Sequence, residues 1–526
     1  MAEVQLGTGK EPQAGTAQGR YSTLESLRMP FLGQARASAK LTIPSLMPDS
    51  RLSGGGMLYQ PFQSVGARGV NNLASKLLLT LLPPNAPFFR LSIDDYVLEN
   101  MKGAGGPAVV TEVQRALARY ERAVMADIEG RTDRVSLFEA LKQLVACGNV
   151  LLFDDPEVGL RTFTMDTFVV QRDSSGNVLE IVVKESLALS TLPEEARKLI
   201  DTDPKGSTGG ADTEKSIDLY TWIRRTPKNW VIEQQINSHT VPGSEGTYPL
   251  DALPWYPLRM VRFAGEHYGR GYVEEFYGDL KSLEGLSKSV VEGTAAAAKV
   301  LFLVNPNGVT RQKTLAESPN GSIKEGNAAD VTVIQMEKYN DFHVALETMN
   351  RIEQRVGQAF LLNSAVTRDA ERVTAEEIRL QAQELEDSLG GLYSLLTQEF
   401  QLPYIRVKMR ALSRRKDWPK LPKGMVKPKI VTGLEGLGRG HDRNRLLQFA
   451  STIANTFGPE AMARYIDASE FIKRLGVSDG IDTDGLVKTA EQVTQEMAQE
   501  QMTGLAQNVA PEVVRGISAQ AQAAQQ

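Results

Sequence analysis

Residues 359–403 constrain the fold most, because a polar loop opens there directly into one long helix. Thr374 is followed by Glu377, the spacing at which a hydroxyl and a carboxylate cap a helix N-terminus reciprocally. Apolar residues then recur at helical spacing up to Pro403, which predicts an amphipathic helix that stops or kinks there. These positions are Ile378, Leu385, Leu389, Leu392, Leu396 and Phe400. The segment contains no catalytic or metal-binding motif, so it indicates architecture rather than chemistry.

The rest of the chain mixes helices with strands, and we expect an α+β, mainly helical fold. Helical spacing covers residues 64–82, 109–128 and 135–144. Apolar alternation on both sides of the turn 174–177 predicts a β-hairpin. Further segments are predicted as strands at 217–224, 230–236 and 300–304, and as helices at 272–299 and 342–362. The helices at 272–299 and 342–362 would flank a small mixed unit that begins with the strand at 300–304.

Composition and charge narrow the class of protein. The 526 residues are enough for several core-forming units, and the formal charge is 59 − 64 = −5. A general DNA clamp is normally basic, so mild acidity favours weak, exchangeable contacts with a duplex. Residues 1–20 are rich in Gly, Ala and Gln and lack the order of a signal peptide. No apolar run approaches the ~20 residues of a bilayer span, so no membrane association is expected.

Candidate enzymatic and metal sites are weak, and we expect neither catalysis nor a cofactor. Gly7 to Lys10 lacks the upstream glycine and strand of a phosphate loop, and a G-x-S-x-G nucleophile elbow is absent. Cys147 lies in an apolar run and is predicted to be a buried hydrophobe. The best metal candidate is a partial calcium loop with Asp482, Asp484 and Glu491. It lacks the first carboxylate, and a helix cap at Asp484 is the preferred interpretation.

Residues 406–429 carry the strongest local charge bias, with ten Lys or Arg side chains and one acid, Asp417. A solvated helix face followed by a Pro/Lys linker is one interpretation. Contact with encapsidated DNA or with an acidic core protein is the other. The glycines of 433–440 do not follow a clear strand and are predicted to form a flexible turn.

Several segments, in this order along the chain, resemble the portal (head-to-tail connector) protein of short-tailed podovirus-type bacteriophages. They span about residues 40–440 together with the long helix described above. The segments are LTIPSL at 41–46, VGARGVNNLASKL at 65–77, LFEALKQLV at 137–145, GNVLL at 148–152, VVQRD at 169–173, GNVL at 176–179 and PLRMVR at 257–262.

The resemblance implies an architecture of wing, stem, clip and crown regions around a central channel. The implied regions are a flexible arm (1–20), the wing (21–270), stem helix 1 (271–299), the clip (300–340), stem helix 2 (341–362), a tunnel loop (363–373), the long wing helix with a basic linker (374–430), the crown (431–495) and a flexible Gln/Ala-rich tail (496–526).

The resemblance also implies a function: a ring, typically a dodecamer, at one capsid vertex that passes DNA during packaging and ejection. Its expected partners are the terminase large subunit, the scaffold and major capsid proteins, the tail adaptor, internal core proteins and double-stranded DNA bound without sequence preference. The expected location is the virion, after assembly in the host cytoplasm. A soluble DNA-binding capsid-assembly factor without a closed channel is the alternative.

Three groups of residues are candidates for this function, each with a plainer interpretation. Asn363, Thr367, Arg368 and Arg372 would form the tunnel loop, or only a helix-capping connector. Lys281 and Lys288 would line the channel from stem helix 1, or simply face solvent. The resemblance places a docking surface on the clip, with Arg311, Lys313 and Lys324 as candidates.

Overall fold

The chain divides into two compact units, Met1–Thr432 and Gly433–Gln526. The computed structural model describes residues 15–48, 57–83, 88–93, 113, 116–188, 191–192, 196–197, 216–297, 301–334, 339–362, 391–414, 426–430, 438–458, 471–472 and 475.

The first unit opens with helices α1 (Ala17–Leu41), α2 (Val65–Leu81) and α4 (Asp133–Cys147), and residues 116–129 before α4 are helical as well. The Thr16 hydroxyl caps α1 by accepting the Gly19 N–H at 3.2 Å, and Ala17 is buried. The prediction of a loose arm up to residue 20 is therefore wrong for its last four residues. The helix α2 ends before Pro83, as predicted.

The helix α4 ends at Gly148, where the chain turns into the first strand of a sheet. Gly148 has φ +81°, and a Cβ atom there would lie 2.4 Å from the Gly271 nitrogen. Both facts require glycine at this position. The turn delivers the chain into a three-stranded antiparallel sheet of order β10-β2-β3, with β2 (Asn149–Asp155), β3 (Gly159–Phe163) and β10 (Trp255–Arg259).

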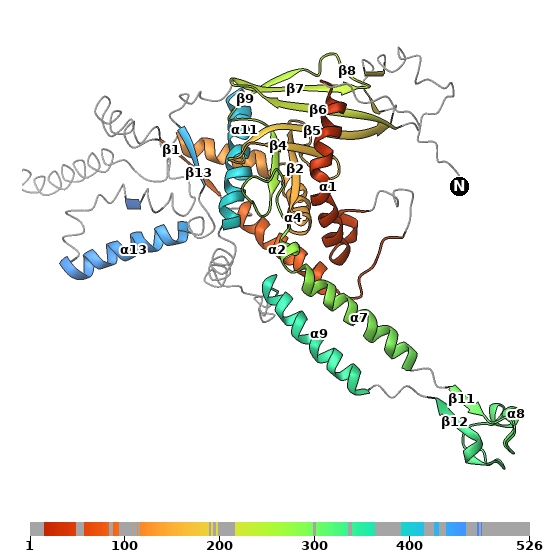
Figure 1. The fold of residues 1–526 in the computed structure, drawn as a ribbon. Helices are drawn as coiled ribbons and strands as arrows, with labels where there is room; N and C mark the ends of the chain where they lie inside the picture. Colours follow the sequence, from red (N-terminus) through yellow and green to blue (C-terminus); the bar gives the residue numbers. More distant parts are fainter. Residues whose placement is uncertain are drawn as a thin grey trace, which may run out of the picture. The chain divides into compact units, whose positions relative to one another are not determined.

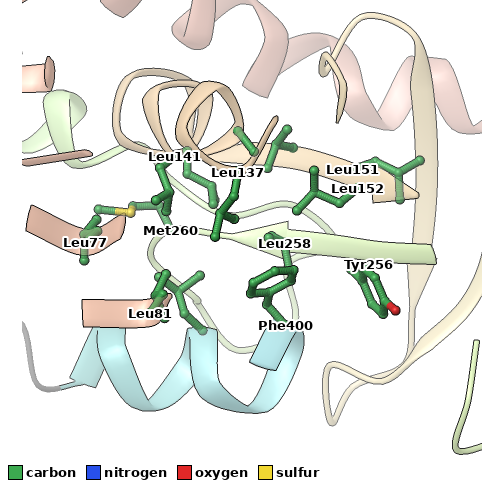
Figure 2. Packing of buried hydrophobic residues seen from close by; sticks show 14 of the residues in the cluster. Leu77, Leu81, Leu137, Leu141, Leu151, Leu152, Tyr256, Leu258, Met260 and Phe400 are labelled. Atoms are coloured by element: carbon green, nitrogen blue, oxygen red, sulfur yellow. The ribbon is translucent and has the colours of Figure 1, made fainter. Parts of the chain in front are cut away.

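This sheet forms the centre of the main hydrophobic core. Figure 2 shows Leu137 and Leu141 of α4 on one side of Leu258 in β10 and Phe400 from a late helical segment on the other, with Leu151 of β2 beside Leu137. All five side chains are buried. Burial of apolar surface between helices from distant parts of the chain and one small sheet holds this unit together.

A second, six-stranded antiparallel sheet confirms the predicted hairpin and the strands near 217–224 and 230–236. Its strands are β4 (Phe168–Arg172), β5 (Val178–Ala188), β6 (Ser216–Arg225), β7 (Asn229–Ile236), β8 (His239–Thr240) and β9 (Gly246–Pro249). The helix α1 packs against it (Figure 1). Arg28, only 1% exposed, donates to the carbonyl oxygens of Asp166 and Phe168 at 2.8 and 2.9 Å.

Two long helices with a small strand unit between them follow in the order predicted. They are α7 (Tyr277–Ala297), β11 (Leu301–Val304), α8 (Gln312–Ala316), η4 (Ala328–Asp330), β12 (Val331–Ile334) and α9 (Tyr339–Ala359). The single helix predicted over 272–299 is interrupted, because Phe276, with φ −107° and ψ 12°, separates the short α6 (Tyr272–Glu275) from α7.

The end of the long helix predicted to reach Pro403 differs from expectation. Residues 391–396 are helical, η6 (Thr397–Gln401) is a π-helical turn, and α11 (Leu402–Ser413) continues beyond the proline. Pro403 does not stop the helix, because it lies in the first turn of α11, where its missing N–H costs little. The predicted cap at Thr374 lies outside the described residues.

A row of buried side chains runs through this segment at steps of four residues. Four-residue steps drift by about 40° in a regular α-helix, and the wider π turn offsets part of that drift. The row stays against the core and consists of Leu396, Phe400, Tyr404, Lys408 and Leu412.

The basic run also differs from expectation at its end. Strand β13 (Val426–Ile430) pairs antiparallel with β1 (Phe89–Ile93), so Lys427 and Lys429 belong to a two-stranded ribbon and not to a linker. In the second unit, α13 (Gly438–Phe457) begins at Gly438. The prediction of a flexible turn is therefore wrong for residues 438–440.

Candidate channel and docking surfaces

The helices α7 and α9 lie side by side and form what we call the stem pair (Figure 1). Gly293 on α7 permits a close approach, because a Cβ atom there would come within 2.7 Å of the Phe342 ring on α9. Leu283 and Ile352 are buried in the pair. Val291, also on α7, is 54% exposed.

Charges on the stem pair are mostly balanced locally. Arg355 of α9 donates two hydrogen bonds, at 2.9 and 2.6 Å, to the carboxylate of Asp279 on α7. Lys288, a predicted channel residue, is exposed and lies 3.9 Å from Glu292. Lys281 is exposed as well, and within the described parts of the chain no carboxylate pairs with it. Of the two predicted stem lysines, only Lys281 presents an uncompensated charge there.

A buried carboxylate that the sequence pattern did not single out fixes α7 to residues 59–63, the segment before α2. Glu284 is 7% exposed and accepts hydrogen bonds from the Tyr59 hydroxyl and from the N–H groups of Phe62 at 3.0 Å and Gln63 at 3.3 Å. The hydrogen bond to Glu284 raises the pKa of Tyr59. The sequence signal for this burial was spacing: Glu284 follows Leu280 by four residues, so both lie on the same, buried side of α7.

The C-terminal end of α9 is fastened to α2. The side chain of Asn72 donates to the carbonyl oxygens of Phe360 and Leu361 at 3.0 and 3.1 Å, and Lys76 donates to Leu361 at 3.0 Å. Gly69 leaves room for the Phe360 ring, which a Cβ atom would approach to 2.7 Å. These contacts fix the chain immediately before the predicted tunnel loop.

The chain returns to the same helix after that loop. The Tyr393 hydroxyl donates to the Thr80 carbonyl at 3.3 Å, and the Gln401 side chain donates to Leu81 at 2.9 Å. The helix α2 therefore anchors both ends of segment 363–390. The predicted loop residues Asn363, Thr367, Arg368 and Arg372 lie within that segment, outside the described residues, as do Asp482, Asp484 and Glu491.

The unit between the stem helices, which we call the tip (residues 301–334), is strongly exposed. The predicted docking residues Arg311, Lys313 and Lys324 are all exposed there. Large apolar side chains are exposed beside them, among them Phe302 at 61% and Ile323 at 99%. Exposed apolar surface of this kind is typical of a protein interface.

Lys408 fits neither interpretation of the basic run, whereas Arg406, Arg410 and Arg414 on the same helix are exposed. The Lys408 side chain is 2% exposed, and its Nζ lies 2.8 Å from Asp154 and 3.2 Å from Asp133. The Tyr404 hydroxyl and the Leu160 N–H also donate to Asp133. Burial raises the pKa of Asp154, and the Lys408 ammonium opposes that rise. The buried cluster of Asp133, Asp154 and Lys408 joins α4, β2 and α11.

A second buried charge cluster surrounds the π turn. Glu399 accepts hydrogen bonds from the Arg259 guanidinium, at 3.0 Å from Nε, and from the Arg259 N–H at 3.1 Å. Arg172 lies 3.5 Å from the same carboxylate. Burial lowers the pKa of Arg172 to about 10, and Glu399 opposes that shift. Glu399 therefore ties the π turn to both sheets.

Cys147 is buried, as predicted, and burial raises the pKa of its thiol to about 12. Among the described residues, no cluster of three or more His, Cys, Asp or Glu side chains is arranged to hold a metal ion. None of the described helices combines the length and apolar composition needed to cross a bilayer.

Comparison with known proteins connects these surfaces to one family. The family model for the bacteriophage head to tail connecting protein matches residues 14–487. The portal protein of Escherichia phage T7 is 40% identical over 530 residues, which cover 99% of this chain and 97% of that protein. The portal protein of Enterobacteria phage T3 is 39% identical, covering 96% of this chain and 94% of that protein.

Other relatives are more distant. The portal protein of Enterobacteria phage SP6 is 31% identical, covering 90% of either chain. A chain in the solved neck of an empty GTA particle is 13% identical with a TM-score of 0.39, covering 80% of this chain and 90% of that one. The family match and the T7 and T3 relatives, which span nearly the whole length, show that this chain belongs to the bacteriophage head-to-tail connecting proteins, the portal proteins of podovirus-type phages.

Proposed function

We propose that this portal protein closes into a homo-oligomeric ring, a dodecamer, whose axial channel carries DNA into and out of the capsid. A closed ring requires two different complementary faces on each subunit. Exposed apolar side chains on the stem pair, Val291 at 54%, Val344 at 63% and Leu346 at 47%, supply surface that a neighbouring subunit would cover.

Anchoring of both ends of segment 363–390 on α2 is the observation that supports the channel most directly. Because both flanks of this segment rest on one helix, the predicted tunnel loop (363–373) would be presented from a fixed base, at the same place in every subunit. Repeated around a ring, Arg368 and Arg372 would form a belt of positive charge. A belt within a Debye length of about 8–10 Å of a duplex resists backward slippage without gripping it.

The tip is the proposed docking surface, first for the terminase large subunit and later for the tail adaptor. Its exposed basic and apolar residues suit successive partners at one site. Scaffold, major capsid and internal core proteins would contact other parts of the ring at the capsid vertex. Assembly would take place in the host cytoplasm before incorporation in the virion. The ring itself would hydrolyse no ATP, because the motor is a separate protein.

Replacing Arg368 with Ala tests the channel function. Rings and procapsids should form normally in negative-stain images, because the contacts that build the fold lie elsewhere, whereas packaging or retention of DNA should fail. Arg351→Ala on α9 is the matched control and should package normally. Normal packaging, retention and ejection by the Arg368 variant would show that the loop is only a connector, and monomers at every concentration would exclude the ring.

A further inference from the structure

An arginine stripe runs along the exposed face of α11. Arg406, Arg410 and Arg414 are all exposed and stand at steps of four residues, so they share one face of the helix. No acidic residue occurs between Gln401 and Arg414 in the sequence. Within the described residues, no carboxylate lies within ion-pair distance of these three guanidinium groups.

Helix stability does not account for the whole stripe. Positive charge near a helix C-terminus is favourable, which is sufficient reason for Arg410 and Arg414. Arg406 lies in the second turn, beyond the reach of that effect. Like charges at four-residue spacing also destabilise an isolated helix. The stripe therefore costs the isolated subunit some stability, which an anionic partner would restore.

The neighbouring ribbon also presents exposed basic side chains. Strand β13 contacts α11 and pairs with β1, and Arg90 stands directly opposite Lys429. Both are exposed, as is Lys427 two residues along the same face. Phe89, Leu91 and Ile93 are buried on the opposite face, which fixes the register and keeps the basic residues outward.

We propose that the arginine stripe and the basic face of the β1–β13 ribbon form a surface that binds the phosphate backbone of duplex DNA outside the channel. The helix α11 and the ribbon strands present basic side chains in rows and contain no acidic residue in their own sequences, which matches a polyanion of closely spaced charges. Arginine and lysine contacts to phosphate give affinity without sequence preference. Such a surface is distinct from the predicted tunnel loop and stem lysines.

Covalently closed DNA minicircles separate this surface from the channel, because a closed circle cannot thread a closed ring. The full-length protein would be compared with two double variants, Arg406→Gln/Arg410→Gln and Lys427→Gln/Lys429→Gln. The matched control is Arg225→Gln/Lys228→Gln, two exposed basic residues at the end of the six-stranded sheet. Each double variant changes the formal charge from −5 to −5 − 2 = −7.

Minicircle affinity is measured by fluorescence anisotropy between 50 and 200 mM salt, with assembly checked by native mass spectrometry. Between 50 and 200 mM salt, each phosphate contact adds a factor of about 3.5 to the loss of affinity. Removing two contacts should therefore make that loss smaller by a factor of about 12. The control should match the unmodified protein. Failure of the unmodified ring to bind minicircles, or equal losses in all three variants, would overturn the proposal.

Loss of ring assembly in the stripe variant with unchanged DNA affinity would assign the stripe to a subunit interface and would also overturn the proposal. Packaging assays keep the two functions distinguishable. A defective channel blocks DNA passage while minicircle binding persists, whereas loss of this outer surface abolishes minicircle binding while rings still form.

Discussion

The buried cluster of Asp133, Asp154 and Lys408 and the stem pair use the same ion-pair chemistry in opposite surroundings. Lys408 is 2% exposed and its two carboxylates 0% and 5%. In the stem, Arg355 is 62% exposed and Asp279 31%. Removing one member of a buried set leaves an uncompensated charge in a poorly polarisable interior, whereas water screens the exposed pair.

This difference divides the molecule by role. The buried cluster holds α4, β2 and α11 in one arrangement, so it serves a part that must stay fixed. The exposed ion pair between the stem helices costs little to break and remake. A ring that conducts DNA needs both properties, a rigid body for assembly and a more adjustable stem.

Lys408→Met gives the largest expected effect on this comparison. It leaves Asp133 and Asp154 buried without a cation, and we expect destabilisation of about 3–5 kcal/mol. Thermal unfolding of the purified protein measures it. Arg410→Met, on the exposed face of the same helix, should change stability by no more than about 0.5 kcal/mol. Equal melting temperatures for the two variants would mean that burial does not distinguish these charges.

Glu399→Gln should cause the next largest loss of stability. It removes the anion between Arg259 and Arg172 but keeps the shape of the side chain, and the expected cost is about 2–3 kcal/mol. The matched control is Glu347→Gln on α9, whose exposed pair with Arg351 should contribute almost nothing. Chemical denaturation compares the two, and a variant as stable as its control would show that the π turn does not depend on Glu399.

Glu284→Gln tests the contact that attaches α7 of the stem pair to residues 59–63. The Gln amide keeps one acceptor oxygen but lacks the negative charge that accepts hydrogen bonds from the Tyr59 hydroxyl and two N–H groups. We expect the free energy of unfolding to fall by about 1–2 kcal/mol. Hydrogen exchange at Phe62 and Gln63 should accelerate. Glu292→Gln, on the exposed side of α7, is the control. Unchanged protection at both amides would show that Glu284 does not hold this segment.

Asp279→Asn should have the smallest effect, about 0–1 kcal/mol, and the difference should fade as salt is added. A double-mutant cycle with Arg355→Gln isolates the pairwise contribution. A coupling energy as large as the loss measured for Lys408→Met would contradict the distinction between the stem pair and the buried cluster.

Local signals in the sequence were enough to predict much of the fold. Pro83 follows α2, and the turn between β4 and β5 contains Ser174 to Asn177, so chain reversals and helix ends were visible as residue types. The order of stem helix, tip and stem helix followed from hydrophobic periodicity alone. These features depend on neighbours in sequence, which is why they could be predicted.

The charge clusters could not be predicted in the same way, because their partners are far apart along the chain. Lys408 and Asp154 are 254 residues apart, and the basic neighbours of Lys408 suggested solvent. The four-residue spacing from Phe400 and Tyr404 was the one local sign of its burial. The π turn before Pro403 is likewise held by contacts of Glu399 with Arg259 and Arg172 on two distant strands.

The π turn at Thr397–Gln401 sets the rotation of the preceding helical residues, 391–396, about the helix axis. A π turn accommodates one more residue than an α-helix of the same length, and one residue corresponds to about 100° of rotation and 1.5 Å of rise. The side on which Tyr393 meets Thr80 is therefore set by a single extra residue. Deleting one residue from the turn would leave α11 in place and rotate the incoming segment by more than a quarter of a circle.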